Sequence, residues 1–233
     1  DRIHLLFNNA GIGGGGSLFT NTREQWERTF NICWGGVYLG VRTFLPLLLN
    51  ADEGHIVNTS SVNGFWASVG MGVSHTAYSA AKFAVKGFTE SLINDLRLNA
   101  PHIKCSVVMP GHIGTSIVAN SRLVQNGTTV LSPNELIGAR QRLQAINIDT
   151  SKMSDADIQK LAEDRARTFR EEAPTSAAQA AKIILGGVKA GKWRILVGDD
   201  AHRLDEKVRQ SPERAYEAEF YQSFVKEVGW RVG

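Results

Sequence analysis

Short apolar runs alternate with longer amphipathic segments along this chain of 233 residues. Four apolar runs stop at glycine, proline or polar clusters and predict buried strands at 3–7, 54–60, 103–109 and 193–197. Helical spacing predicts helices at 22–49, 76–99, about 175–188 and 211–228. This alternation predicts an α/β fold, in which helices cover both faces of a parallel sheet.

Local signals place the ends and the weak points of these helices. Thr22 and Gln25 fit a capping box, because their side chains can satisfy backbone groups at a helix start. Pro101 follows the helix 76–99 and stops it. Within 22–49, Gly35 and Gly36 are expected to loosen the helix, and Pro46 to kink it near its end.

The composition is that of a globular protein, with 42% hydrophobic and 21% charged residues. No run approaches 18 consecutive apolar residues, so we expect no membrane-spanning helix. The net charge is +3, but the Lys and Arg residues are scattered, which disfavours a nucleic-acid partner.

The two cysteines, Cys33 and Cys105, cannot form a disulfide framework. The chain opens without a basic and apolar leader. Both features predict free thiols in the cytoplasm. We expect no metal site, because no set of His, Cys, Asp and Glu residues has ligand spacing.

A Gly-rich segment, residues 11–16, satisfies the pattern G-x-G-x-x-G directly after the first strand. A dinucleotide site of this type needs a helix that begins at the last glycine and an acidic residue about 20 positions later. Neither follows, since the next helix begins at Thr22. We interpret the segment as a loop.

Tyr78 and Lys82 stand four residues apart on one predicted helix, so they share a face. An unperturbed Tyr has a pKa near 10, so forming its phenolate at pH 7 costs about 4 kcal/mol. Such a Tyr exchanges protons poorly at this pH. A cation held beside it is expected to lower its pKa. The hydroxyl of Ser61, at a strand end, can polarise a carbonyl at the same point. Alone, this spacing is also common in exposed helix pairs.

Four segments occur together in order: 8–11 (NNAG), 56–64 (IVNTSSVNG), 78–82 (YSAAK) and 110–115 (PGHIGT). Together they resemble the short-chain dehydrogenase/reductase family, strongly over residues 1–115 and loosely over 173–200. The resemblance implies a Rossmann-type, doubly wound parallel sheet. It also implies an NAD- or NADP-dependent oxidoreductase that acts on a secondary alcohol or ketone.

The resemblance implies a role for each matching residue. Ser61, Tyr78 and Lys82 resemble the catalytic set, in which Ser binds the substrate oxygen, Tyr is the acid/base and Lys holds the nicotinamide ribose. The implied cofactor-binding residues are Tyr78 and Lys82 again, with Asn9, Ala10 and Gly11 on the adenosine side and Pro110, Gly111, Ile113 and Thr115 around the nicotinamide.

Three departures from the family pattern stand out. The family usually has an Asn, supporting a proton-relay water, where this chain has Cys33; Asn31 lies about 200° round the helix from it.

The second departure is that Ser61 and Tyr78 are further apart in the sequence than usual, which lengthens the loop 65–74. Its apolar side chains, either a wall of the substrate pocket or ordinary core, are Phe65, Trp66, Val69 and Met71.

The third departure is at the start, because the chain begins at what resembles the family's fourth strand. The expected earlier part, of roughly 70–80 residues by average element lengths, would carry the pyrophosphate loop and the residue that separates NAD from NADP. The chain therefore resembles a fragment, and its first strand is expected to expose a sheet edge.

We interpret residues 1–233 as a single domain, with 200–233 as a helical tail. Residues 116–173 stand where the family carries a helical substrate lid. Their apolar positions fit either a lid or an oligomer contact: Leu131, Leu136, Leu143, Ile146 and Ile148. By analogy, helices 22–49 and 76–99 would pair in a homodimer or homotetramer.

Some residues and functions keep two interpretations. His75 either faces the pocket beside Tyr78 or belongs to a helix start, and His112 either borders the cofactor or does not. The alternative functions are a non-catalytic binding or scaffold protein, favoured by Cys33, and a nucleic-acid binder, suggested only by the pI near 8.9.

Overall fold

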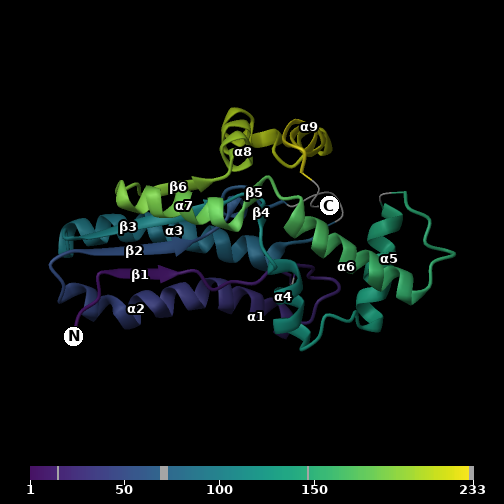
Figure 1. Cartoon of the computed structure of the whole chain (residues 1–233), viewed down its shortest axis with the longest axis horizontal. Helices are drawn as coiled ribbons and strands as arrows, with labels where there is room; N and C mark the ends of the chain where they lie inside the picture. The colour runs from purple at the N-terminus through teal and green to yellow at the C-terminus, as the bar shows by residue number, and fades with distance from the viewer. Residues whose placement is uncertain (15, 69–72, 146, 231–233) are drawn as a thin grey trace.

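A four-stranded parallel sheet forms the centre of the computed structural model, which describes residues 1–14, 16–68, 73–145 and 147–230. Its strands lie in the order β1–β2–β3–β6 (Figure 1). They are β1 (Leu5–Asn8), β2 (Gly54–Thr59), β3 (Ile103–Pro110) and β6 (Arg194–Val197). All four predicted strands are present, and β1 lies at one edge of this sheet. The predicted α/β fold is confirmed.

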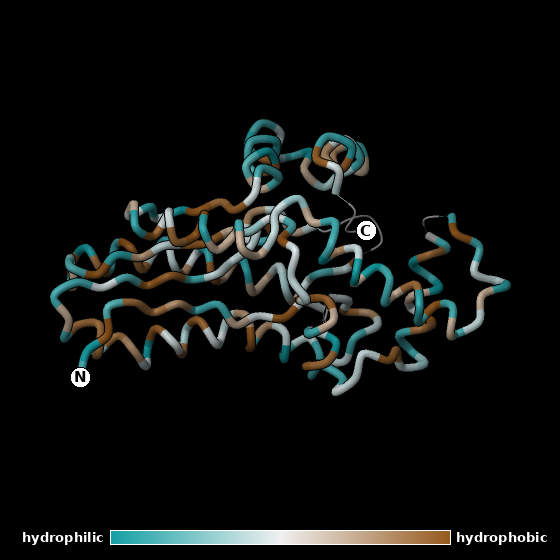
Figure 2. Tube along the Cα trace, viewed as in Figure 1, coloured by the Kyte–Doolittle hydropathy of each residue, from teal (hydrophilic) through white to brown (hydrophobic). Residues whose placement is uncertain are grey.

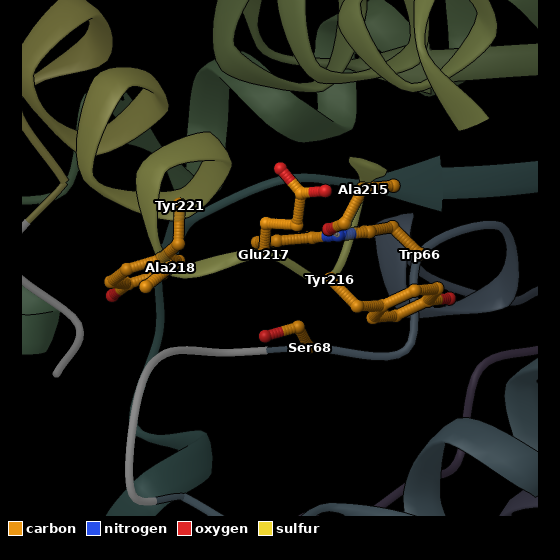
Figure 3. Close-up of a pocket in the computed structure, with 7 residues that line it drawn as sticks. All are labelled: Trp66, Ser68, Ala215, Tyr216, Glu217, Ala218 and Tyr221. Atoms are coloured by element: carbon orange, nitrogen blue, oxygen red, sulfur yellow. Dashed lines mark hydrogen bonds between the residues drawn. The ribbon is translucent and has the colours of Figure 1, made fainter. Parts of the chain in front are cut away.

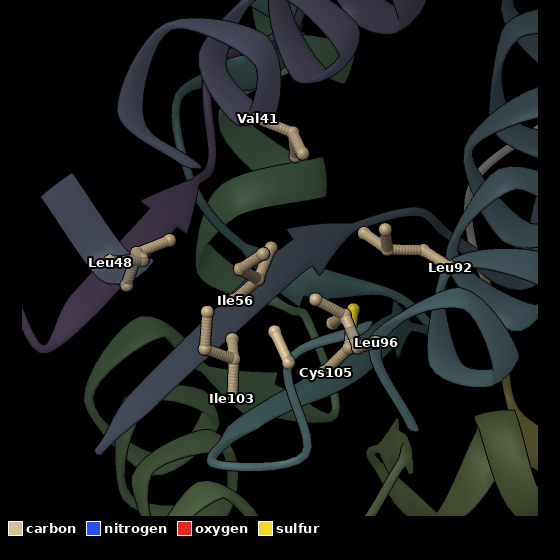
Figure 4. Packing of buried hydrophobic residues seen from close by; sticks show 8 residues of the cluster. Val41, Leu48, Ile56, Leu92, Leu96, Ile103 and Cys105 are labelled. Carbon is tan, nitrogen blue, oxygen red and sulfur yellow. The ribbon is translucent and has the colours of Figure 1, made fainter. Parts of the chain in front are cut away.

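Both faces of the sheet are buried. Alternate residues of β2 point to opposite sides, and on each side they pack in an apolar cluster. Ile56 pairs in register with Cys105 and packs among residues of α2 (Gly36–Leu49) and α3 (Thr76–Asn99), as Figure 4 shows. Val57, the next residue, packs on the other face with α7 (Ala177–Lys189). Apolar residues on both faces are typical of a doubly wound sheet.

The long first helix is interrupted. The chain forms α1 (Arg23–Phe30), a π-helical turn η1 (Asn31–Gly35) and then α2. The Thr22–Gln25 capping box is present, and the turn ends at Gly35 and is followed by Gly36, where the sequence predicts a loosened helix. A π turn changes which side chains face the sheet, and such turns are frequent at functional sites.

Between residues 116 and 173, the part of the chain that the structure describes forms three helices: α4 (Ile117–Asn126), α5 (Pro133–Ala145) and α6 (Asp155–Glu171). Ser154 caps α6 in a capping box. Leu131, Leu143 and Ile158 form a separate small core with Leu136 at its edge, and α5 lies beyond the ends of the sheet strands (Figure 1). Ile148 is exposed, and Ile146 lies outside the described residues.

The C-terminal prediction is wrong in detail. Instead of one helix at 211–228, the chain forms α8 (Asp199–Gln210), a 3-10 turn η3 (Pro212–Arg214) and α9 (Ala218–Val228). Pro212 opens the short turn, and α9 begins only after it. Helix α8 lies in the segment expected as a helical tail, but its bounds were not predicted. It is charge-rich, and its fully buried apolar side chains are those of Ala201 and Leu204. Figure 2 shows this contrast, with α8 largely hydrophilic and the strands hydrophobic.

One helical segment within the described residues, Arg23–Leu49, is long and apolar enough to cross a membrane by length and composition. Its inner face carries the buried Val37, Val41 and Leu48. Its outer face also exposes apolar side chains, among them Leu39 and Phe44. The segment therefore has a core face and a second, uncovered apolar face.

Candidate active site

The predicted site residues gather where the strands of the sheet end. Residues 9–11 follow β1, Ser61 follows β2, and residues 110–115 begin at the last residue of β3. Tyr78 and Lys82 lie in the first two turns of α3, which packs against β3 and η2 (Val62–Gly64). Carboxyl ends of parallel strands are where doubly wound sheets bind ligands. The structure thus brings the three candidate catalytic residues to one place.

Lys82 is buried, with 3% of the residue exposed. Its Nζ donates to the carbonyl oxygen of Thr59, at 2.9 Å, and its own carbonyl accepts from the hydroxyl of Ser60, at 2.7 Å. Burial lowers the pKa of Lys82. An ammonium group has three N–H donors, and Thr59 is the one acceptor that the described residues provide. Donors are left for a bound ligand.

Tyr78 differs from the sequence expectation. Burial raises the pKa of Tyr78 above its ordinary value, Cys33 adds to the rise, and a hydrogen bond with Ser61 opposes it. Lys82 stands beside the ring, its Nζ 5.4 Å from the ring centroid, but desolvation of the phenolate outweighs it in this form. Tyr78 is therefore a neutral phenol near pH 7, and it holds its proton more tightly than an unperturbed Tyr.

Ser61 is oriented by local backbone structure. It caps η2, and its Oγ accepts from the backbone N–H of Asn63 at 3.1 Å. Gly64 allows this turn to approach α3 closely, since a Cβ there would lie 2.8 Å from the carbonyl oxygen of Lys82. The turn and the helix therefore place Ser61 near Tyr78.

Cys33 occupies the inner side of the π turn, and Asn31 is exposed. The thiol of Cys33 is fully buried and donates to the carbonyl oxygen of Ile12 at 3.1 Å. It packs in one cluster with Ile12, Ala81 and Tyr78. The expectation that Cys33, not Asn31, faces this region agrees with the structure.

The loop after β1 is held by side chains that the sequence did not single out. Ser121 accepts from the backbone N–H of Gly13 at 2.8 Å, and Gln125 donates to the carbonyl oxygen of Gly13 at 2.8 Å. Both lie on α4. Asn9 accepts from the hydroxyl of Thr59, and Ala10 is exposed. The described part of this loop leads to a helix only at Arg23 and does not form a G-x-G-x-x-G helix start.

The segment 110–115 is anchored mainly through its backbone. Ile113 and Gly114 form β4, which pairs with β5 (Thr175–Ser176). His112 is buried, and its Nε2 lies 2.7 Å from the carbonyl oxygen of Phe169 in α6. Burial lowers the pKa of His112. Its imidazole thus holds the insertion against this segment.

Phe65 and Trp66 pack mainly against the C-terminal helices. Trp66 is fully buried among Phe220, Phe224 and Trp230, so its main role is core packing. One edge of it bounds a pocket of about 180 Å³ between the loop after η2 and the start of α9, shown in Figure 3 with Ser68, Tyr216 and Tyr221. Val69 and Met71 lie outside the described residues.

His75 lies beside the candidate acid/base. Its ring stacks on Tyr78 with centroids 4.8 Å apart, and its Nδ1 is buried without a hydrogen-bond partner among the described residues. Burial lowers the pKa of His75 to about 4, so the ring is neutral near pH 7. The interpretation of His75 as a residue beside Tyr78 agrees with this geometry.

The described residues fit part of a nicotinamide dinucleotide. Lys82 has spare donors for vicinal hydroxyls, and a Cβ at Gly11 would lie 3.5 Å from its Nζ. Asn9 and Ala10, in the same loop as Gly11, are exposed. Cys105, by contrast, lies in the core, where burial raises its pKa to about 12. Among the described residues, no group of three His, Cys, Asp or Glu side chains could hold a metal ion.

Comparison with known proteins agrees with this geometry. The family model for short chain dehydrogenases matches residues 1–126. The chain is 31% identical to SadH of Mycobacterium tuberculosis over 89% of its own length and 62% of the relative's. The chain thus spans less than two thirds of this curated relative.

Solved structures give the same fold. A short-chain dehydrogenase/reductase from Burkholderia phymatum, in complex with NAD, has a TM-score of 0.62 and 28% identity over 91% of this chain and 66% of its own. A short chain dehydrogenase from Burkholderia cenocepacia, in complex with NADP, has a TM-score of 0.60 and 20% identity over 94% and 68%. The second likeness concerns the fold alone.

Proposed function

Because this chain belongs to the short-chain dehydrogenase family, we propose that the protein interconverts a secondary alcohol and a ketone with NAD or NADP as its cofactor. One observation carries the proposal. Ser61, Tyr78 and Lys82 converge at the ends of the strands, with a hydrogen bond between Ser61 and Tyr78 and a buried Lys82 beside the phenol.

Each side chain has a distinct part in this reaction. Tyr78, a neutral phenol, donates its proton to the carbonyl oxygen during reduction and takes it back during oxidation. The Ser61 hydroxyl binds the same oxygen and stabilises the charge that develops there. When bound, the nicotinamide supplies or accepts the hydride. Lys82 orients the ribose through its free N–H donors and assists ionisation of Tyr78 electrostatically.

The remaining cofactor contacts belong to the loops after β1 and β3. We assign the adenosine side to Asn9, Ala10 and Gly11, and the nicotinamide side to Pro110, Gly111, Ile113 and Thr115. Partial exposure of these residues supports the assignment. Both NAD and NADP occur in solved relatives of this fold, and either is compatible with the described residues.

The protein is further proposed to act as a cytoplasmic homodimer or homotetramer, joined through α2 and α3. Support comes from the exposed apolar side chains on these helices, including Leu39, Phe44 and Leu98. Covering such a face removes apolar area from water, which favours association. The partner proposed for this apolar face of α2 and α3 is a second copy of the same chain.

A titration of the full-length protein with NADH and NADPH tests the cofactor part of the proposal. Saturable binding of one cofactor is expected, and Lys82→Met should weaken it by about tenfold or more, since hydrogen bonds from a charged group contribute about 1.5–3 kcal/mol. Lys86→Met, one turn along α3 in a pair with Glu90, is the control. Equal binding by both variants, or no binding by the wild type, contradicts the assignment.

A further inference from the structure

A buried carboxyl group lies behind the segment 110–115. Asp200 stands in the first turn of α8 and is 3% exposed. Its Oδ2 accepts two hydrogen bonds, from the backbone N–H of His112 at 2.7 Å and from the indole Nε1 of Trp230 at 2.7 Å. The side chain thus joins the segment after β3 to the end of the C-terminal helix region.

The position of this carboxyl group is restricted on two sides. A Cβ added at Gly111 would lie 2.6 Å from the Cγ of Asp200, and a Cβ at Gly198 would collide with its Oδ1. Gly198 has φ of +99°, which L residues rarely adopt. Two glycines therefore form a close cradle around one acidic side chain. Its Oδ1 has no hydrogen-bond partner among the described residues.

Asp200 supplies a side-chain acceptor where the neighbouring contacts of the segment 110–115 are between backbone groups. The backbone N–H of Gly111 donates to Val197, at 3.0 Å, and Thr115 donates to Ile113, at 2.8 Å. β4 pairs with β5 through Ile113 and Gly114. At His112, between these backbone contacts, the acceptor is instead the Asp200 side chain. Removing it would leave the backbone N–H of His112 without its acceptor, so that the residue would be held by its imidazole contact with Phe169 and no longer by its backbone.

We infer that Asp200 is a positioning residue for the cofactor, acting through the backbone of His112 and held in place by Trp230. The inference rests on the proposed function, because it takes residues 110–115 as the nicotinamide contact. With Asp200 present, the segment is ordered before the cofactor binds. Without it, binding has to order the segment, and the affinity falls.

Cofactor titrations of four variants of the full-length protein, each with a thermal melt, test this inference. Asp200→Ala is expected to raise the cofactor Kd about tenfold, the cost of ordering about one backbone residue. Trp230→Phe, which removes one of the two donors, should raise it about two- to fivefold. Asp200→Asn keeps an accepting oxygen and should stay within about threefold of the wild type.

Asp205→Ala is the matched control, on the same helix. Asp205 pairs with Arg194, and both side chains are largely buried. Its loss should lower the melting temperature while the cofactor Kd stays within about twofold, because the pair does not touch residues 110–115. Cofactor binding weakened equally by Asp200→Ala and Asp205→Ala would overturn the inference and leave the proposed function standing.

The remaining outcomes are also decisive. If Asp200→Ala does not fold, Trp230→Phe decides, and an unchanged Kd in that variant overturns the inference. A wild-type protein that binds neither NADH nor NADPH overturns the proposed function, and this inference with it. Weakened binding in Asp200→Ala, rescued in Asp200→Asn, supports both.

Discussion

The thiol of Cys33 lies 3.1 Å from the carbonyl oxygen of Ile12, and this contact joins the π turn of the first long helix to the loop after β1. Both residues pack with Tyr78. The resemblance to the family places a relay-supporting Asn at this position. In this chain, the Cys33 thiol at this position instead forms a hydrogen bond that joins the helix to the loop.

Replacing Cys33 tests this hydrogen bond. Cys33→Ala removes the donor and leaves a small cavity, so it should lower the free energy of unfolding by about 1–2 kcal/mol and slow turnover several-fold. Cys33→Ser keeps a donor of similar size and should retain more activity. Urea denaturation and steady-state rates measure both effects. Equal turnover in the two variants would show that the hydrogen bond to Ile12 is unimportant.

Gly64 sets the distance between the Ser61 turn and α3. In Gly64→Ala, the new methyl group would meet the Ser60 hydroxyl and lie 2.8 Å from the carbonyl oxygen of Lys82. We expect a loss of stability of about 1–3 kcal/mol. We also expect a loss of turnover, because Ser61 and Tyr78 would move apart. Thermal melts and rate measurements check both.

Gly186→Ala is the control for that substitution. Nothing lies within 4 Å of a Cβ at this helical glycine, so the variant should be up to about 1 kcal/mol more stable. Its activity should equal that of the wild type. A Gly64→Ala protein with normal stability and rate would contradict the close approach of Gly64 to α3.

The main elements were predictable because their signals are local. The four strands are apolar runs with clear stops, and α3 begins at Thr76 and ends at Asn99, within the range expected from its sequence. The positions of Tyr78 and Lys82 follow from helical spacing alone. The pKa of Tyr78 was not predictable in the same way, because the extent of desolvation depends on packing from distant segments.

The stability of the protein should depend on pH through His75. Burial lowers the pKa of His75 from 6.5 to about 4, so between these values the unfolded chain binds more protons than the folded one. The contribution of His75 to the free energy of unfolding is therefore fully present above pH 6.5. It is lost as the pH decreases toward 4, which lowers the free energy of unfolding by about 2–3 kcal/mol.

The variant His75→Phe keeps a ring against Tyr78 and removes the titration. Between pH 7.5 and pH 4, the unfolding free energy of the wild type should fall by about 2–3 kcal/mol more than that of the variant. His55 and His112, whose pKa values are also lowered by burial, contribute equally to both proteins. Parallel curves would mean that folding does not change the pKa of His75.

The apolar face of α2 should control self-association. Leu39 is 61% exposed, so Leu39→Glu places a charge on the proposed contact, where burying it without a partner is costly. Light scattering should show a smaller oligomer than for the wild type. Leu185→Glu on α7, 49% exposed in the single chain, should leave the mass unchanged. The same mass in all three proteins would place the contact elsewhere.

Other features depend on contacts between segments far apart in the sequence. Ser121 and Gln125 hold Gly13 across more than 100 residues, and Trp66 packs among residues near the C-terminus. No local pattern marks these pairs. The bounds of α8, within the expected helical tail, were not predicted because its few apolar positions lie among charged residues.

The most direct test of the proposed function is the rate of Tyr78→Phe compared with its cofactor affinity. This substitution removes only the hydroxyl that is proposed to transfer the proton. With a panel of secondary alcohols and ketones, we expect turnover to fall by about 10²–10⁴-fold, while the Kd for NAD(P)H stays close to that of the wild type. Undiminished turnover in Tyr78→Phe, or a wild-type protein that binds the cofactor and turns over no substrate, would contradict it.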